Sequence, residues 1–265
     1  AYHEVTTVAL PKKDKGAQPL DHRLLAIFTS LYRIEAGAWF DHIKPWLRSI
    51  LHSDVMGAIE GTEALDIAWD AQIFLEKALL NNEAMALVSY DFKKFFDSFD
   101  HAFTREMLIH AGVPEAMADL THNLYTNMRK TLKIGGPLGL HTHSYNGLGQ
   151  GDVASTFPVL AHTSGQFYML AYKLPNLRMG AIIDDRNVRG SFDDVIEACR
   201  LATPYDYKSG HSTQHEKTVV LTTSEEDQRR LATVSIDGFQ PTYATQAVVV
   251  GDLITTQTRK STAHN

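Results

Sequence analysis

Apolar and polar positions follow helical spacing in the first part of the chain and a mixed pattern of short runs and helices after it. Apolar residues recur at helical spacing between residues 20 and 52, and a second helix is predicted over 62–80, capped by Thr62. Short apolar runs at 84–90 and 179–183 predict strands. Further predicted elements are helices at 103–110, after Pro114, after Gln150 and at 191–202, a hairpin near 131–137, and short strands at 218–221, 233–236 and 247–254.

The order of these elements is helices followed by β-α-β-β-α-β. A split β-α-β order of this kind predicts an α+β fold with an antiparallel sheet.

Acidic residues stand at the ends of two of the predicted strands. Asp91 follows the run at 84–90, and Asp184 and Asp185 follow the run at 179–183. Nucleotidyl transfer by two divalent ions needs carboxylates from separate strands to converge, so that the ions lie about 3.5–4 Å apart. Taken singly, each acidic position is an ordinary strand end or hairpin tip, so the surrounding motifs decide the interpretation.

Several further motifs stand in a consistent order around these acids. NGLGQGDVAS occupies 146–155 between them, and HEKTVVL from His215 and VVVGD from Val248 follow them. With these residues the chain resembles a reverse transcriptase, most closely the polymerase domain of non-LTR retrotransposons and group II intron proteins. In chain order, the segment with Asp91, the segment 146–155, the pair Asp184-Asp185, the segment from His215 and the segment from Val248 correspond to motifs A, B, C, D and E of that family. The segments LPK, RLLAIFTSLYRI and GAIEGTEALD are similar to the upstream fingers blocks, so the resemblance covers residues 10–255. It implies a right-hand polymerase palm, an antiparallel sheet with helices on one face, plus partial helical fingers.

The resemblance implies a catalytic centre with two Mg²⁺ ions, or Mn²⁺ in their place. Asp91, Asp184 and Asp185 would hold the ions together with the carbonyl oxygen of Phe92, because hard divalent cations prefer oxygen ligands. Lys217 corresponds to the lysine of motif D, near the departing pyrophosphate, where an ammonium neutralises charge or donates a proton.

The resemblance also implies a nucleotide pocket. Lys12 and Arg23 correspond to the fingers residues that grip the triphosphate, and Gln150 and Gly151 to the turn that lines the pocket. Phe96 corresponds to the ring beneath the incoming sugar. Phe offers a 2′-hydroxyl no hydrogen bond, so this position predicts a preference for deoxynucleotides. The neighbouring rings of Phe95 and Phe99 are predicted to be core residues.

The resemblance divides the chain into three parts. Residues 1–83 are expected to form a fingers-like segment that is truncated at its N-terminus. Residues 84–255 are expected to form the palm, with fingers elements interleaved. Residues 256–265 are expected to be a C-terminal tail, and the thumb to be absent.

Composition is compatible with this interpretation, whereas charge argues against it. The chain has 265 residues, 44% of them hydrophobic, and a net charge of −6, which is unusual for a nucleic-acid-binding protein. Residues 51–100 hold ten acids and three bases, whereas residues 121–151 hold three bases and no acid. No apolar run is long enough to span a membrane. The single cysteine, Cys199, predicts an intracellular location, cytoplasmic or nuclear.

The predicted function is an RNA-directed DNA polymerase, a nucleotidyltransferase that extends a DNA or RNA primer with deoxynucleoside triphosphates on an RNA template. An RNA-directed RNA polymerase is one alternative, and Phe96 with the Gln150-Gly151 turn argues against it. A catalytically silent palm remnant that binds nucleic acid is the other. The intact acids argue against this second alternative, while the acidic charge and the changed motifs, such as Ile182-Ile183 before the acids, leave it open. The thirteen histidines lack metal-site spacing and are predicted to be surface or structural residues.

Overall fold

The computed structural model describes residues 3–12, 22–134, 136–236 and 240–256. Two compact units are present: residues 1–51, 94–162 and 208–211 form the first, and residues 52–93, 163–207 and 212–265 form the second. The predicted boundaries after residues 83 and 255 stay predictions. Among the described residues, none of the helices has both the length and the apolar character needed to cross a bilayer.

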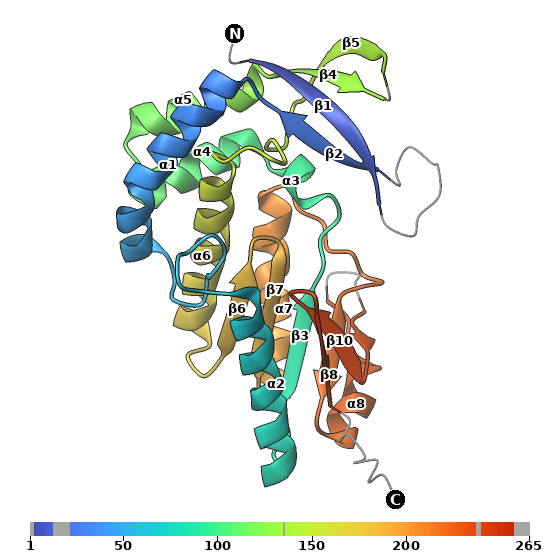
Figure 1. Ribbon diagram of the computed structural model, residues 1–265. Helices are drawn as coiled ribbons and strands as arrows, with labels where there is room; N and C mark the ends of the chain where they lie inside the picture. Colours follow the sequence, from blue (N-terminus) through green and yellow to red (C-terminus); the bar gives the residue numbers. More distant parts are fainter. Residues whose placement is uncertain (1–2, 13–21, 135, 237–239, 257–265) are drawn as a thin grey trace, which may run out of the picture. The chain divides into compact units, whose positions relative to one another are not determined.

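The first unit contains a four-stranded sheet and several helices (Figure 1). The strand order is β2-β1-β4-β5; β1 pairs antiparallel with β2 and parallel with β4, and β4 pairs antiparallel with β5. Its elements are β1 (Glu4–Pro11), β2 (His22–Ile27), α1 (Ser30–Ile50), α3 (Phe95–Ser98), α4 (His101–His110), α5 (Glu115–Thr126), β4 (Arg129–Lys133) and β5 (Leu138–His143). The predicted hairpin near 131–137 is confirmed as β4 and β5.

The helical prediction for residues 20–52 is right only from Ser30 onward. Residues 22–27 form a strand because their backbone pairs with β1, with Leu10 opposite Arg23, and this tertiary pairing overrides the local helical pattern. The helix α1 begins at Ser30, where the hydroxyl of Thr29 accepts a hydrogen bond from the backbone N–H of Tyr32 at 3.4 Å.

The second unit is built on a five-stranded sheet with the order β6-β7-β3-β8-β9. The central strand β3 pairs antiparallel with β7 and with β8, and β7 pairs antiparallel with β6. Its elements are α2 (Ala64–Asn81), β3 (Ala86–Tyr90), β6 (Arg178–Ile182), β7 (Asp185–Gly190), α7 (Phe192–Lys208), β8 (Val219–Thr222), α8 (Glu225–Leu231), β9 (Thr242–Tyr243), β10 (Gln246–Val249) and β11 (Asp252–Thr255). A further helix, α6 (Thr156–Lys173), begins in the first unit and continues into the second.

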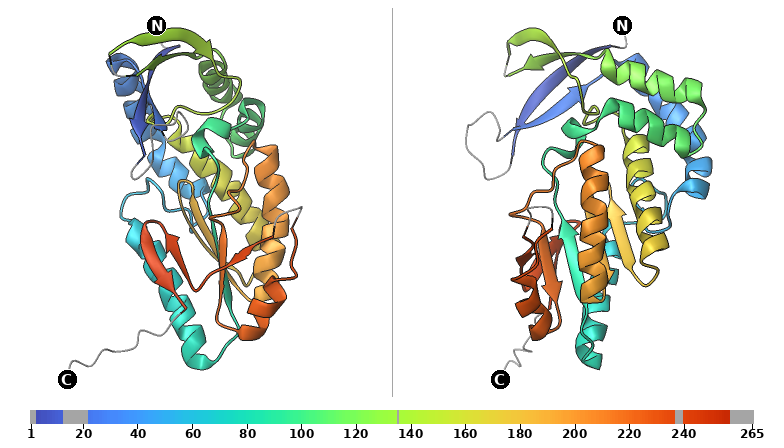
Figure 2. Two further views of the ribbon diagram at one scale, coloured as in Figure 1. Left: turned by 90° about the vertical axis from the view of Figure 1, so that its right-hand side faces the viewer. Right: turned by 180° about the vertical axis from the view of Figure 1, so that it is seen from behind.

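Side chains of β3 alternate between two packed faces, as the period of two requires. Leu87 lies in a buried cluster with residues of α2, β8 and the β10–β11 hairpin. On the other face, the hydroxyl of Tyr90 donates a hydrogen bond to Sγ of Cys199 in α7 at 3.2 Å. Both views in Figure 2 show α7 on the side of this sheet away from α2 and β11. The sheet is therefore covered on both faces.

Two C-terminal predictions differ from the structure. Residues 247–254 form two strands, because Val250 and Gly251 both have positive φ, at 52° and 89°, and turn the chain into a hairpin. Residues 233–236 form no strand of the sheet. The helix α8 precedes them, capped by the hydroxyl of Ser224.

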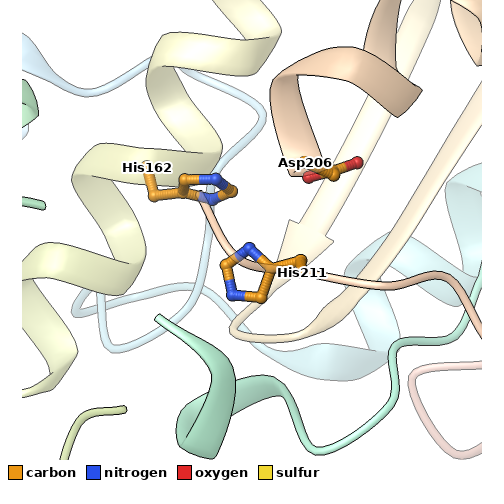
Figure 3. A group of neighbouring side chains, drawn as sticks. All are labelled: His162, Asp206 and His211. Atoms are coloured by element: carbon orange, nitrogen blue, oxygen red, sulfur yellow. The ribbon is translucent and has the colours of Figure 1, made fainter. Parts of the chain in front are cut away.

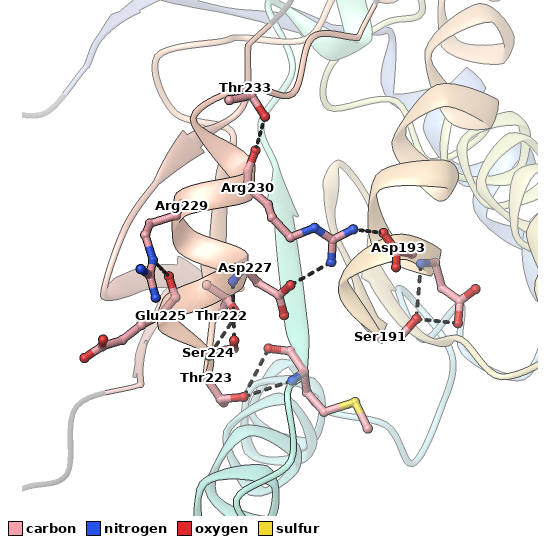
Figure 4. Close-up of polar contacts among 12 residues, drawn as sticks. Ser191, Asp193, Thr222, Thr223, Ser224, Glu225, Asp227, Arg229, Arg230 and Thr233 are labelled. Carbon is pink, nitrogen blue, oxygen red and sulfur yellow. Dashed lines mark hydrogen bonds and ion pairs between the residues drawn. The ribbon is translucent and has the colours of Figure 1, made fainter.

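The helix α8 is tied to the rest of the second unit by one arginine. Arg230 forms ion pairs with Asp227 of its own helix, at 2.9 Å, and with Asp193 of α7 (Figure 4). Its guanidinium also lies 4.6 Å from the ring centroid of Phe192. With both units described, the predicted α+β fold class is confirmed.

Candidate active site

Asp91 lies directly after β3, and its backbone is fixed from both sides. Its N–H donates a hydrogen bond to Oγ1 of Thr218 at 3.1 Å, and its carbonyl oxygen accepts one from the N–H of Gln214 at 2.7 Å. Thr218 is fully buried. Sequence reasoning missed this support, because a threonine after a lysine carries no signal of a contact so far away along the chain.

Asp184 and Asp185 lie at the tip of the β6–β7 hairpin. Ile182 pairs with Asp185, so Ile183 and Asp184 form a two-residue connection. The strand β7 is the antiparallel neighbour of β3, and Tyr90 is opposite Arg186. Continuing this register by one residue places Asp91 opposite Asp185.

The three carboxylates form one electrostatic cluster. Partial removal of water, the negative charge of Asp184 and the negative charge of Asp91, in decreasing order, together raise the pKa of Asp185 to about 6. The Asp185 residue is nevertheless exposed at the surface. A group of acids that repel one another while reachable from solvent has the donor chemistry that a divalent cation requires. These residues therefore fit the ions that the resemblance implies.

Lys217 lies beside the acidic cluster. Its Nζ is 3.0 Å from Oδ2 of Asp91, and both side chains are partly exposed. An ion pair in such a setting contributes little to stability. The ammonium is the cation that balances Asp91 here.

The first residue of β7 after the two acids is a buried arginine. Arg186 is 2% exposed, and its Nη1 donates hydrogen bonds to Oδ1 of Asp206 at 3.1 Å and to Oε1 of Gln166 at 3.0 Å. Its guanidinium lies 4.7 Å from the ring centroid of Phe92. Arg186 thus forms a hydrogen-bonded ion pair in the interior of the second unit.

The remaining predicted site residues belong to the first unit. The carbonyl oxygen of Gln150 accepts a hydrogen bond from the N–H of Ala26 in β2 at 2.8 Å. Gly151 has a φ of +101°, and a Cβ at this position would lie 2.8 Å from Cδ1 of Leu25, so glycine is required. Arg23 is exposed in β2, and Lys12 is exposed just after β1. The turn and the strand β2 are therefore joined within one unit.

Phe96 differs from its aromatic neighbours in exposure. Phe95 and Phe99 are 4% and 0% exposed, which confirms that they are core residues, whereas Phe96 is half-buried. The carbonyl oxygen of Phe96 accepts a hydrogen bond from the N–H of Leu148 at 2.6 Å. This bond connects Phe96 to the segment that precedes Gln150.

Sequence reasoning also missed a buried carboxylate next to Gly151. Oδ2 of Asp152 accepts hydrogen bonds from the hydroxyls of Tyr32 at 2.9 Å and Tyr125 at 2.7 Å. Oδ1 accepts one from the N–H of Ala154 at 3.1 Å. Burial raises the pKa of Asp152 above its usual value, and these three donors oppose the rise. The carboxylate anchors the Gln150-Gly151 turn to the helices α1 and α5.

Two histidines lie close together in the first unit. Nε2 of His162 and Nδ1 of His211 each lie 2.8 Å from Oγ of Ser209, and all three residues are buried. Figure 3 shows the rings of His162 and His211. The two rings thus share one serine hydroxyl in the interior of the first unit.

Comparisons with solved structures identify the fold. Residues covering 96% of this chain superimpose on 53% of an apo telomerase from Candida tropicalis truncated from its C-terminal domain, with a TM-score of 0.63 and 13% identity. A telomerase from the same organism, in complex with the TWJ fragment of telomeric RNA, is covered over 46% of its length, with a TM-score of 0.60 and 13% identity. The corresponding telomerase complex from Candida albicans has a TM-score of 0.58 and 11% identity, covering 95% of this chain and 44% of that one.

The fold is reverse-transcriptase-like. The chain spans about half the length of the telomerases that it matches. No profile of a known protein family and no curated protein sequence matches the chain. At this identity the likeness shows the fold, and the activity has to be argued from the residues.

Proposed function

We propose that this chain is an RNA-directed DNA polymerase, of the type found in non-LTR retrotransposons and group II introns. The observation that carries the proposal is the meeting of two acidic segments on adjacent antiparallel strands. Asp91 follows β3, Asp184 and Asp185 lie at the start of β7, and the charges of the first two raise the pKa of the third. A palm that transfers nucleotides needs carboxylates in this relationship.

Asp91, Asp184 and Asp185 would hold two Mg²⁺ ions, with the carbonyl oxygen of Phe92 as a further ligand. When bound, the ions supply charge stabilisation for the attacking primer oxygen and for the leaving pyrophosphate. The strand pairing of β3 and β7 would fix the positions of the carboxylates relative to one another, which lowers the cost of assembling a metal site.

Lys217 would act on the leaving group. Its ammonium pairs with Asp91. The lysine side chain is 59% exposed and would be able to turn toward the pyrophosphate. There it neutralises developing negative charge or donates a proton.

Residues of the first unit would select and hold the nucleotide. Arg23 and Lys12 provide exposed cations for the triphosphate, and the Gln150-Gly151 turn presents backbone and amide groups. The half-buried ring of Phe96 would lie under the sugar and exclude a 2′-hydroxyl. The substrates are thus deoxynucleoside triphosphates, a DNA or RNA primer and an RNA template. The likeness to telomerases, two of them in complex with a fragment of telomeric RNA, supports RNA binding.

Metal binding and primer extension together test the proposal. Mn²⁺ titration of the 265-residue protein, followed by electron paramagnetic resonance, should show binding that Asp184→Asn weakens strongly. Asp41→Asn is the matched control, because its side chain is 70% exposed and belongs to the first unit. Extension of a labelled primer on an RNA template with deoxynucleotides should then require Mg²⁺ and be lost in Asp184→Asn.

Each outcome has a clear meaning. Mn²⁺ binding that does not depend on Asp184 contradicts the proposal, because the proposal needs Asp184 as a metal ligand. Mn²⁺ binding without any extension favours the silent palm remnant. Extension that prefers ribonucleotides favours an RNA-directed RNA polymerase.

A further inference from the structure

The connection that carries Asp184 has an unusual backbone. Ile183 has a φ of +56°. Isoleucine is branched at Cβ, and such residues rarely adopt the left-handed region. A conformation of this kind persists only where the surrounding structure holds it. The residue immediately before Asp184 must therefore be held by contacts outside the two-residue connection.

Residues 54–56, which precede α2, pair with β6 of the β6–β7 hairpin. The N–H of Ala181 in β6 donates a hydrogen bond to the carbonyl oxygen of Asp54 at 3.0 Å, and the N–H of Met56 donates one to the carbonyl oxygen of Ala181 at 2.9 Å. Val55 forms a parallel bridge with Ala181 and is buried. The segment thus pairs with β6 just before the hairpin tip.

Gly57 follows this pairing and packs on the tip itself. A Cβ at Gly57 would lie 2.9 Å from the backbone N of Ile183 and 3.2 Å from its Cδ1. The φ of Gly57 is not positive, so the close approach of the two backbones, rather than backbone conformation, requires glycine here.

The segment is closed into a compact loop on its other side. Oγ1 of Thr62 lies 2.7 Å from the carbonyl oxygens of both Met56 and Ile59. Glu63 follows as the N-terminal cap of α2, where its N–H donates to the carboxylate of Asp66 at 2.8 Å. The loop is therefore anchored to a helix whose inner face is buried in the second unit.

We infer that residues 54–62 form a buttress that holds the left-handed Ile183 and thereby aims Asp184 and Asp185 toward Asp91, with Gly57 as the positioning residue. The inference rests on the proposed function, because the aim of these carboxylates matters only if they bind metal ions. Gly57 touches neither ion nor substrate and acts through the backbone of Ile183.

The test compares two glycine-to-alanine variants by Mn²⁺ affinity in the 265-residue protein. In Gly57→Ala the new methyl group collides with Ile183, so the hairpin tip must move. Gly37→Ala is the matched control, because a Cβ at Gly37 has nothing within 4 Å. Thr62→Val adds no collision but removes the hydroxyl that closes the loop. Circular dichroism and thermal unfolding establish which variants are folded at the temperature of the Mn²⁺ titration.

Gly57→Ala should weaken Mn²⁺ binding by about 10- to 100-fold, the usual effect of losing support around metal ligands, whereas Gly37→Ala should bind as the parent does. A folded Gly57→Ala protein with the parent's affinity overturns the inference. If Gly57→Ala does not fold, Thr62→Val decides: weaker binding supports the buttress and unchanged binding overturns it. Mn²⁺ binding by the parent that is insensitive to Asp184→Asn overturns the proposed function instead.

Discussion

Nζ of Lys217 and Oδ2 of Asp91 are 3.0 Å apart, so a lysine balances the carboxylate that follows β3. A cation that enters the cluster has to compete with this ammonium for the same oxygen. Cation binding and the ion pair of Lys217 are therefore coupled through the charge of Asp91.

Lys217→Ala should tighten Mn²⁺ binding and slow primer extension at the same time. Removing a competing positive charge from a partly exposed pair is worth about 0.2–1 kcal/mol, or roughly a 1.4- to fivefold gain in affinity. Isothermal titration with Mn²⁺ measures the first effect and single-turnover extension the second. Lys77→Ala, at an exposed position of α2, should change neither. Weaker Mn²⁺ binding in Lys217→Ala would show that the lysine supports the site rather than competing for it.

Phe96→Val should admit ribonucleotides with a much smaller penalty in kcat/KM, while deoxynucleotide incorporation falls only moderately. Each tenfold change in the ratio corresponds to about 1.4 kcal/mol of differential transition-state stabilisation. Competitive incorporation of matched nucleotides by parent and variant measures it. Phe99→Leu, at a fully buried position, is the control for a loss of core packing. An unchanged ratio in Phe96→Val would remove this ring from sugar selection.

Tyr125→Phe should lower the free energy of unfolding by about 1.5–3 kcal/mol, because it removes one hydroxyl donor from a buried carboxylate. The hydroxyl donates to Asp152 at 2.7 Å, and Tyr125 is 2% exposed. Urea denaturation measures the loss. Tyr145→Phe, at a 94% exposed position, should have no effect. A Tyr125→Phe protein as stable as the parent would mean that Tyr32 and Ala154 satisfy Asp152 without it.

Stability should also fall as the pH drops below about 6.5 because of His101. Burial lowers the pKa of this side chain, and the carbonyl oxygen of Gly147, 2.8 Å from its Nε2, partly opposes the shift. Since the folded pKa lies below the unfolded value, the unfolded chain binds the proton more readily. The stabilising contribution is therefore present above pH 6.5 and is lost on acidification.

Urea-induced unfolding tests this prediction: the urea concentration at the midpoint of unfolding is measured at pH 7.5 and at pH 5.5. His101→Gln keeps a donor for Gly147 and removes the titration, so the midpoint should fall less between the two pH values than in the parent. An equal fall in both proteins assigns the pH dependence to other groups.

The sequence predicted the local elements that carry the acids better than it predicted their support. Asp91 after a strand and Asp184 at a hairpin follow from short apolar runs bounded by polar residues. The buried ion pair of Arg186 could not be predicted, because its partner Asp206 is distant in the sequence and the energetics depend on three-dimensional contacts. The strand β2 was missed for a related reason, since only its pairing with β1 distinguishes it from a helical pattern.

The outer strand of the first sheet has a practical consequence for handling the protein. All six residues of β5 are exposed, and the side chains of Leu138 and Leu140 are 65% and 89% exposed. Among the described strands, β5 pairs only with β4, so its other edge presents open backbone groups. Such an edge invites aggregation at high concentration. A lysine in place of Leu140 is the substitution of choice for improving solubility before crystallisation.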